Sequence, residues 1–242
     1  MLPVSLREFP PPMPPLIVQF ARAEIDRWFA ADEWPHPDLQ QVPVMTFAQA
    51  WLAEPDRGLR PGRVWLLSTP AAFVVLAELL DDDIMTEARQ HNDPLWDLGD
   101  VFESFVRHTA RPDYYEFHVA PNAVTLDLHY PRFYAPRENG VGQYLLTRPH
   151  FTAFVSAQPG SGRWRIAMEI PVGALVPAEL VREESEWQFS FCRYDCGPNR
   201  PPMVSSTTPH RGAGFHRAEE WRHFRVPAFR PSVGKLHHVA QQ

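Results

Sequence analysis

The chain has 242 residues, and 27 of them are prolines, about 11% and roughly twice the usual share of a globular protein. Because proline interrupts helices and central strands, this content excludes a helical bundle, a coiled coil and a long helical repeat. Hydrophobic residues make up 44% and aromatic residues 12%, which is enough apolar surface to exclude a disordered chain. A net charge of -6 without any basic run argues against a nucleic-acid partner.

The N-terminal region is the most proline-rich part of the chain. Residues 1–15 hold six prolines and predict an irregular, partly polyproline arm ahead of one domain formed by residues 16–242. We expect the arm to pack along the domain, with recognition as a proline-rich ligand as the alternative. The arm lacks the unbroken apolar stretch of a secretory signal, and no apolar run suits a membrane span. The sequence as written therefore favours the cytoplasm, whereas a signal missing from it would place the protein outside.

Short strands dominate the predicted elements. Residues 16–62 favour a helix near 21–31 and a strand near 42–47. Further strands are predicted at 63–68, 73–79, 101–106, 114–119, 124–130, 151–157, 164–170 and 187–194. Within the segment 124–130 apolar residues alternate with Thr125, Asp127 and His129, which predicts that these three face solvent. Nine or ten such strands predict an all-β fold, an antiparallel jelly-roll-like β-sandwich with short helical turns.

Cysteine and histidine usage restricts the remaining chemistry. Cys192 and Cys196 are too few for a disulfide framework and are expected to be buried free thiols. The histidine pairs 216/223 and 237/238 lack the usual spacing of zinc ligands. Neither pattern indicates a transition-metal enzyme.

Three groups of segments, taken in order, carry a family resemblance. They are AAFVVLAELLDDDI at 71–84; DPLWDLGDVFESF at 93–105 with YYEFHVAPN at 114–122; and WRIAMEIP at 164–171 with FSFCRYD at 189–195 and FHR at 215–217 before Trp221. In this order they resemble the family 9 carbohydrate-binding modules and the domains like them. The resemblance covers residues 16–228 and is densest over 63–226.

The resemblance implies a fold, a function and a partner. Members of this family are antiparallel β-sandwiches that bind a sugar, often a chain end, between aromatic rings. They tend to carry calcium, and many are attached to glycoside hydrolases. The expected function is therefore non-catalytic binding of a mono- or oligosaccharide, with a glycoside hydrolase as a further partner.

The family motifs also imply particular site residues. Trp96 and Phe215 match the two aromatic platforms, although Phe215 stands where tryptophan is usual. Glu103 matches the residue that accepts hydrogen bonds from sugar hydroxyls, and His118 occupies the position of a basic residue. Further binding candidates are Asn122, Arg193 and Trp221. The alternative for each aromatic residue is a core position, to which we assign Trp65, Trp164 and Trp187.

An acidic stretch is the candidate for calcium. Residues 81–100 contain eight oxygen-bearing side chains, and calcium takes about six to eight oxygen ligands. The predicted ligands are Asp81, Asp83, Asp93 and Asp100. The alternative is a solvated loop in which an aspartate caps a short helix at 84–89.

Other functions remain open at this stage. A glycoside hydrolase needs two carboxylates, and Glu103 could be paired with Glu116 or Glu169. A cofactor-binding sandwich could hold haem between a methionine, Met85 or Met168, and a histidine. A purely structural sandwich is the last alternative.

Overall fold

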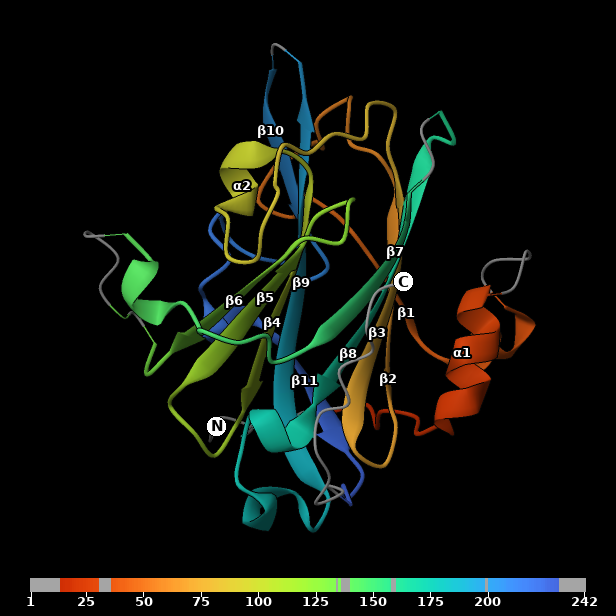
Figure 1. Ribbon diagram of the computed structural model, residues 1–242, viewed down its shortest axis with the longest axis vertical. Coiled ribbons are helices and arrows are strands. Elements are labelled where there is room, and N and C mark those ends of the chain that lie inside the picture. The colour runs from red at the N-terminus through yellow and green to blue at the C-terminus, as the bar shows by residue number, and fades with distance from the viewer. Residues whose placement is uncertain are drawn as a thin grey trace, which may run out of the picture.

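The strands form two antiparallel sheets that pack face to face (Figure 1). The computed structural model describes residues 14–30, 36–133, 135, 140–157, 160–198 and 200–230. The five-stranded sheet has the order β1 (Val44–Thr46), β2 (Gly62–Ser68), β3 (Ala72–Leu80), β8 (Arg163–Pro171) and β7 (Thr152–Ala157). This arrangement confirms the predicted all-β sandwich.

The six-stranded sheet is organised around one long strand. Its order is β10 (Arg200–Ser206), β9 (Ser185–Gly197), β4 (Val101–His108), β5 (Tyr114–Val119) and β6 (Thr125–Tyr130), with β11 (Arg222–Val226) also paired to β9. One edge of β9 pairs with β4, and its other edge pairs first with β11 and then with β10. Every strand predicted from the sequence is present, whereas β10 and β11 were not predicted.

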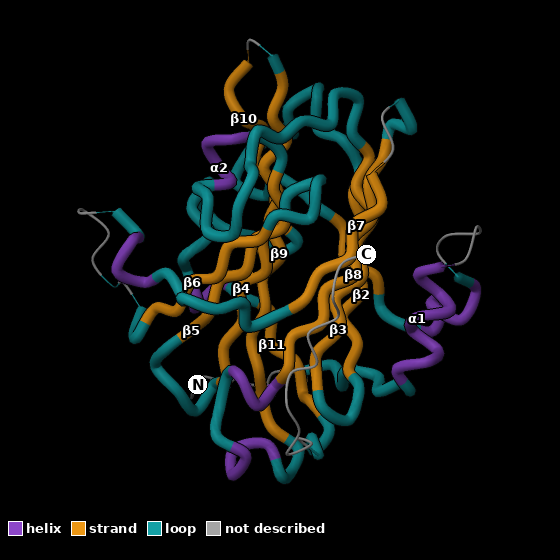
Figure 2. The backbone as a smooth tube through the Cα atoms, in the orientation of Figure 1, coloured by secondary structure: helices purple, strands orange, loops and turns teal. Residues whose placement is uncertain are grey.

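The helices are short and lie outside the sheets. They are α1 (Arg22–Ala30), α2 (Leu95–Leu98) and the 3-10 turns η1 (Pro37–Gln41), η2 (Gly142–Tyr144), η3 (Val172–Ala174), η4 (Ala178–Val181) and η5 (Ala218–Glu220). The rest of the described chain runs in loops around the strands (Figure 2). Within the described residues, every helix is too short or too polar to cross a bilayer.

Two predictions for the helices have different outcomes. The helix expected near 21–31 is confirmed as α1. The alternative helix at 84–89 is wrong, because Thr86 forms a β-bridge with Gly99 and the Glu87 amide donates to the Leu98 carbonyl. The segment therefore runs antiparallel to residues 98–100 instead of coiling upon itself.

Apolar side chains fill three separate cores. Alternate residues of β8, including the fully buried Trp164, meet Phe102 and Trp187 between the two sheets. A second core lies on the outer face of the six-stranded sheet, where loops cover Phe105 and its neighbours. The third lies between the five-stranded sheet and α1, and it contains Trp65. The predicted core positions of the three tryptophans are confirmed.

The prediction that Thr125, Asp127 and His129 face solvent is wrong at Asp127, in the middle of β6. Asp127 is fully buried, and its Oδ2 accepts a 2.6 Å hydrogen bond from the His150 backbone amide. His129 stacks on Tyr115 with 4.4 Å between ring centroids. The alternation itself is present, but the loop at 146–151 covers the side that the sequence pattern assigns to solvent.

Candidate functional site

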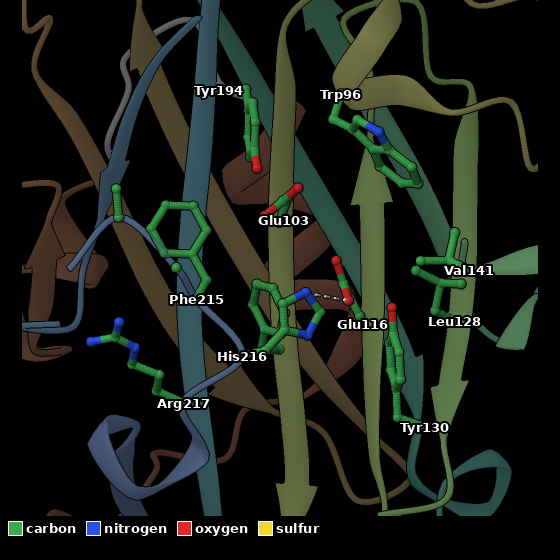
Figure 3. A pocket seen from close by; sticks show the side chains of 13 residues that line it. Trp96, Glu103, Glu116, Leu128, Tyr130, Val141, Tyr194, Phe215, His216 and Arg217 are labelled. Carbon is green, nitrogen blue, oxygen red and sulfur yellow. Dashed lines mark ion pairs between the residues drawn. The ribbon is translucent and has the colours of Figure 1, made fainter. Parts of the chain in front are cut away.

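A cavity of about 520 Å³ opens on the outer face of the six-stranded sheet. Its floor carries two carboxylates, Glu103 from β4 and Glu116 from β5. Aromatic rings line much of the rest, and Trp96 and Phe215 lie on either side of Glu103 (Figure 3). The cavity thus combines an acidic floor with apolar walls.

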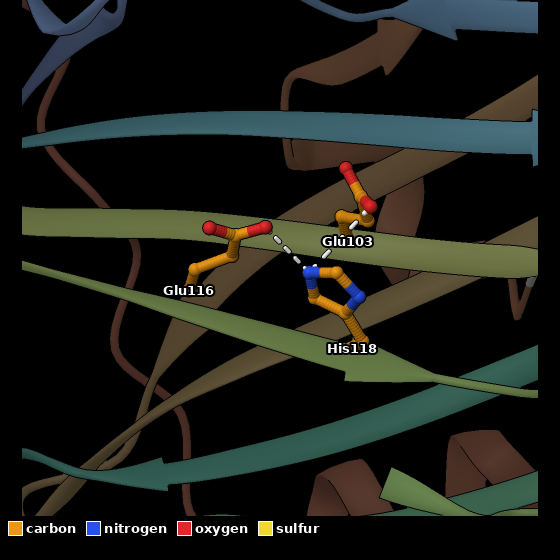
Figure 4. A group of neighbouring side chains, drawn as sticks. All are labelled: Glu103, Glu116 and His118. Carbon is orange, nitrogen blue, oxygen red and sulfur yellow. Dashed lines mark hydrogen bonds and ion pairs between the residues drawn. The ribbon is translucent and has the colours of Figure 1, made fainter. Parts of the chain in front are cut away.

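Glu103 and Glu116 on the cavity floor form a buried cluster with His118, which lies beneath them. Glu103 is the cross-strand partner of His118, and Glu116 lies two residues earlier on the same face of β5. The three side chains are 3%, 4% and 0% exposed. His118 Nε2 lies 2.6 Å from Glu116 Oε1 and 3.5 Å from Glu103 Oε1 (Figure 4). Because an ionised carboxylate only accepts hydrogen bonds, Nε2 donates its proton to Glu116.

Burial changes the proton affinity of this cluster. Loss of solvent raises the pKa of Glu103 to about 8, with a further increase from the charge of Glu116 and an opposing effect of His118. Burial also disfavours the imidazolium of His118, but the charges of Glu103 and Glu116 outweigh it and raise the pKa of His118. The cluster therefore retains protons near neutral pH.

Local backbone geometry places Trp96 at the cavity. Trp96 lies in α2, a single turn that Gly99 terminates with a φ of +144°. A Cβ atom on Gly99 would come within 2.4 Å of the Met85 carbonyl oxygen, so only glycine permits this close approach. The indole ring consequently faces the cluster, with its centroid 5.6 Å from the His118 ring.

The opposite wall comes from the loop between β10 and η5. The Phe215 carbonyl accepts a 2.8 Å hydrogen bond from Trp221 Nε1, and the Phe215 ring packs against Trp51 and Tyr194. The next residue, His216, has Nδ1 2.9 Å from the Tyr114 hydroxyl. These contacts hold the loop against the sheet.

A second buried cluster joins the ends of three strands. Oxygens of Asp81, Asp100 and Asp195 lie within 4.8 Å of one another. Arg193 Nη2 lies 3.1 Å from Asp81 Oδ2 and 3.0 Å from Asp195 Oδ2. Arg200 pairs with Asp195 as well. Two guanidinium groups therefore already occupy positions beside these carboxylates.

The acidic cluster does not fit calcium. Both oxygens of Asp100 accept backbone amides, from Met85 at 2.6 Å and Cys196 at 2.7 Å. The Arg193 guanidinium bridges the other two carboxylates where a cation would lie, and a calcium ion there would meet like charge. Ion pairs therefore join the end of β3 to β9, whereas Asp100, at the start of β4, is held by backbone amides alone.

Comparison with known proteins gives a fold. No model of a known protein family matches the chain, and no curated protein matches it. A solved structure from Bacteroides uniformis, provisionally assigned as carbohydrate-binding, is 14% identical with a TM-score of 0.59, over 78% of this chain and 88% of that one.

Two further structures are family 9 carbohydrate-binding modules from Caldicellulosiruptor kristjanssonii, one in complex with cellotriose and one with glucose. The cellotriose complex has 11% identity, a TM-score of 0.56 and coverage of 92% of this chain and 98% of that one. For the glucose complex these values are 9%, 0.56, 91% and 98%. The chain has the family 9 fold. The resemblance predicted from the sequence motifs is confirmed at this level.

Within this family 9 fold, four of the predicted binding residues come together. Trp96, Glu103 and Phe215 line the cavity, and His118 lies directly beneath its floor. Glu116 was predicted only as a carboxylate of the alternative hydrolase. Its position two residues before His118 on one strand could have indicated that both side chains share a face.

The other three candidates lie away from the cavity lining. Asn122 lies in the turn between β5 and β6 and joins that turn to the segment around residue 88, because its amide donates to the Ala88 carbonyl at 2.7 Å. Trp221 is 2% exposed in the second core, and Arg193 points between the sheets into the acidic cluster.

The predicted calcium ligands also separate in the family 9 fold. Asp81 and Asp100 join the cluster together with Asp195, which the sequence did not indicate. Asp83 instead lies 3.4 Å from Arg200, and Asp93 accepts the backbone amides of residues 89 and 90.

Proposed function

We propose that the protein is a non-catalytic carbohydrate-binding module that holds one sugar unit in the cavity above Glu103. The observation that carries this proposal is the placement of Trp96 and Phe215 on either side of a carboxylate floor (Figure 3). A pyranose has apolar C–H faces that pack on aromatic rings and a hydroxyl rim that donates to carboxylates. The cavity offers both kinds of surface.

The size of the cavity and the similar structures support the proposal. A volume of about 520 Å³ falls within the usual range of small-molecule sites, about 300–1,000 Å³. Two solved structures with this fold contain cellotriose and glucose. Sugar binding by this chain, and a glycoside hydrolase as its partner, are inferences from that likeness.

The arrangement of the carboxylates favours binding over hydrolysis. Glu103 and Glu116 project from neighbouring strands on one sheet face, so both approach a ligand from the same side. Glycosidases instead need carboxylates that flank the scissile bond. Glu169, the other candidate, belongs to β8 in the opposite sheet and pairs with Arg22.

The binding proposal is tested by calorimetric titration with glucose, cellobiose and cellotriose. Trp96→Ala removes one wall, and we expect sugar affinity to fall about tenfold or more because stacking on the ring is lost. Phe154→Ala is the control, since Phe154 is 51% exposed on β7, in the other sheet. Absence of binding by the wild type to every sugar, or equal affinities of wild type and Trp96→Ala, would overturn the proposal.

Catalysis is tested separately with a panel of chromogenic glycosides. We expect no turnover above background, because the carboxylates do not flank a bond. Turnover by the wild type that disappears in Glu103→Gln would show that the module is an enzyme.

A further inference from the structure

The charges around the cavity floor are unevenly balanced. In the described part of the chain, His118 is the one basic side chain within 4 Å of both Glu103 and Glu116. Asp127, fully buried on the opposite face of the sheet, acts on the same imidazole from further away. One histidine thus serves several carboxyl groups.

The other basic groups at the cavity are further from Glu103: His216 pairs with Glu116, and Arg217 pairs with Glu220. His216 Nε2 lies 3.6 Å from Glu116 Oε2, while its Nδ1 contacts the Tyr114 hydroxyl. Arg217 lines the cavity, but its Nη1 lies 3.8 Å from Glu220 and its side chain is 39% exposed. Within the described residues, the ion pair of Glu103 is with His118, at 3.5 Å.

Burial makes this imbalance costly for the free protein. A buried carboxylate without a full counter-charge is destabilised, and the pKa of Glu103 rises to about 8. A cation brought into the cavity would let the proton leave and would contact Glu103 and Glu116 together. The cavity walls also favour a cation. Aromatic faces attract cations, and the rings of Trp96, Tyr194 and Phe215 surround Glu103 (Figure 3).

We propose that the preferred ligand is a sugar that carries a protonated amine, an amino sugar of the aminodeoxyhexose class. Its ammonium group contacts Glu103 and Glu116, and its ring packs between Trp96 and Phe215. This inference rests on the sugar-binding function proposed above and names the class of sugar. The same group can come from a free amino sugar or from the de-N-acetylated end of an amino polysaccharide.

The test compares ligands that differ only at the amine. D-glucosamine, D-glucose and N-acetyl-D-glucosamine are titrated into the wild-type protein at a pH where glucosamine is protonated, with the β-1,4-linked glucosamine dimer as the chain-end probe. We expect glucosamine to bind about tenfold more tightly than glucose, because a charge-assisted hydrogen bond is roughly twice as strong as a neutral one. Tighter binding of the dimer than of the monomer assigns the chain end as the source.

A variant and a salt series separate charge from shape. Glu103→Gln keeps the size of the side chain but cannot lose a proton to become the carboxylate that the ammonium group contacts, so the ratio of glucosamine to glucose affinity should fall towards one. Folding of the variant is checked by circular dichroism. If it does not fold, salt serves on the wild type: raising sodium chloride from about 50 to about 500 mM should weaken glucosamine binding and leave glucose binding nearly unchanged.

The outcomes distinguish this inference from the function on which it rests. If glucose binds as tightly as glucosamine and Trp96→Ala weakens both, the amino-sugar inference fails and sugar binding stands. If no sugar binds, both fail. If choline, an ammonium without a sugar ring, binds as tightly as glucosamine, the inference fails because the ring contributes nothing.

Discussion

Two buried acidic clusters lie on opposite faces of the six-stranded sheet, and they are neutralised in different ways. Asp81, Asp100 and Asp195 face the interior of the sandwich, as does Arg193, the cross-strand partner of the core residue Phe102. Two arginines pair with this cluster. The other cluster, with Glu103 at its centre, faces the cavity and forms its ion pairs with His118 and His216.

The difference separates a structural cluster from a binding cluster. Arginine keeps its charge at any physiological pH and bridges two carboxylates with fixed geometry, so Asp81 and Asp195 have a permanent counter-charge without a ligand. The cavity cluster has an imidazole whose protonation varies, and its open side leads to aromatic rings. A counter-charge from outside the chain can act only in the second case.

The largest expected effect comes from removing the arginine of the structural cluster. Arg193→Met leaves Asp81 and Asp195 buried without their shared partner, and we expect the free energy of unfolding to fall by about 3–5 kcal/mol. Chemical denaturation measures the loss. Arg182→Met is the matched control, because the Arg182–Glu179 pair is about 70% exposed and such pairs contribute about 0–1 kcal/mol.

A second substitution sharpens this test. Adding Asp81→Asn to Arg193→Met removes one of the charges left unpaired, so we expect part of the stability to return and the two effects to be non-additive. A loss below about 1 kcal/mol in Arg193→Met alone would contradict the structural role of the cluster.

A smaller effect is expected from pH, through buried carboxyl groups on both faces of the six-stranded sheet. Burial raises the pKa values of Asp100 and Asp127 to about 7 and that of Glu103 to about 8. Carboxyl groups with raised pKa values bind more protons in the folded state than in the unfolded state, so stability is present at low pH and is lost as pH rises through these values. Between about pH 6.5 and 8.5 we expect the free energy of unfolding to fall by about 3 kcal/mol.

The chosen pH window also avoids an opposing contribution. Burial lowers the pKa of His108 and His210, and such groups destabilise the fold only as pH falls towards acid. Denaturation of Asp127→Asn across the same range should give a shallower slope, while Asp26→Asn, on the exposed surface of α1, should keep the wild-type slope. Stability that rises with pH in the wild type would contradict the expectation.

Most of the sheet framework could be predicted from the sequence because alternation and turn residues mark each strand. The two missed strands lack these signals: β10 begins Arg200-Pro201-Pro202, and prolines argue against a strand. β11 is short and carries mostly polar residues between Trp221 and Val226. The buried position of Asp127 depends on a loop that lies about twenty residues later in the chain.

The candidate site could be predicted only where a motif fixes it locally. Trp96, Glu103 and Phe215 occupy motif positions, and the structure brings them together at one cavity. Arg193 also stands in a motif, but its partner Asp81 is 112 residues away, and only the folded chain shows that this pair closes the interior cluster. A pattern of residues indicates which face of a strand is shared and leaves open what covers that face.

The smallest expected effect is that of calcium on the interior cluster, where we expect no binding. If arginine completes the interior cluster, then neither calcium nor a chelator should change the melting temperature by more than about 1 °C, because an ion that does not bind the native state adds no stability. Differential scanning calorimetry in calcium and in EDTA measures this. Magnesium at the same ionic strength controls for screening. A rise in melting temperature that depends on calcium concentration and is lost in Asp81→Asn would show that the cluster accepts an outside cation despite its two arginines, and the division between a closed and an open acidic cluster would then have to be abandoned.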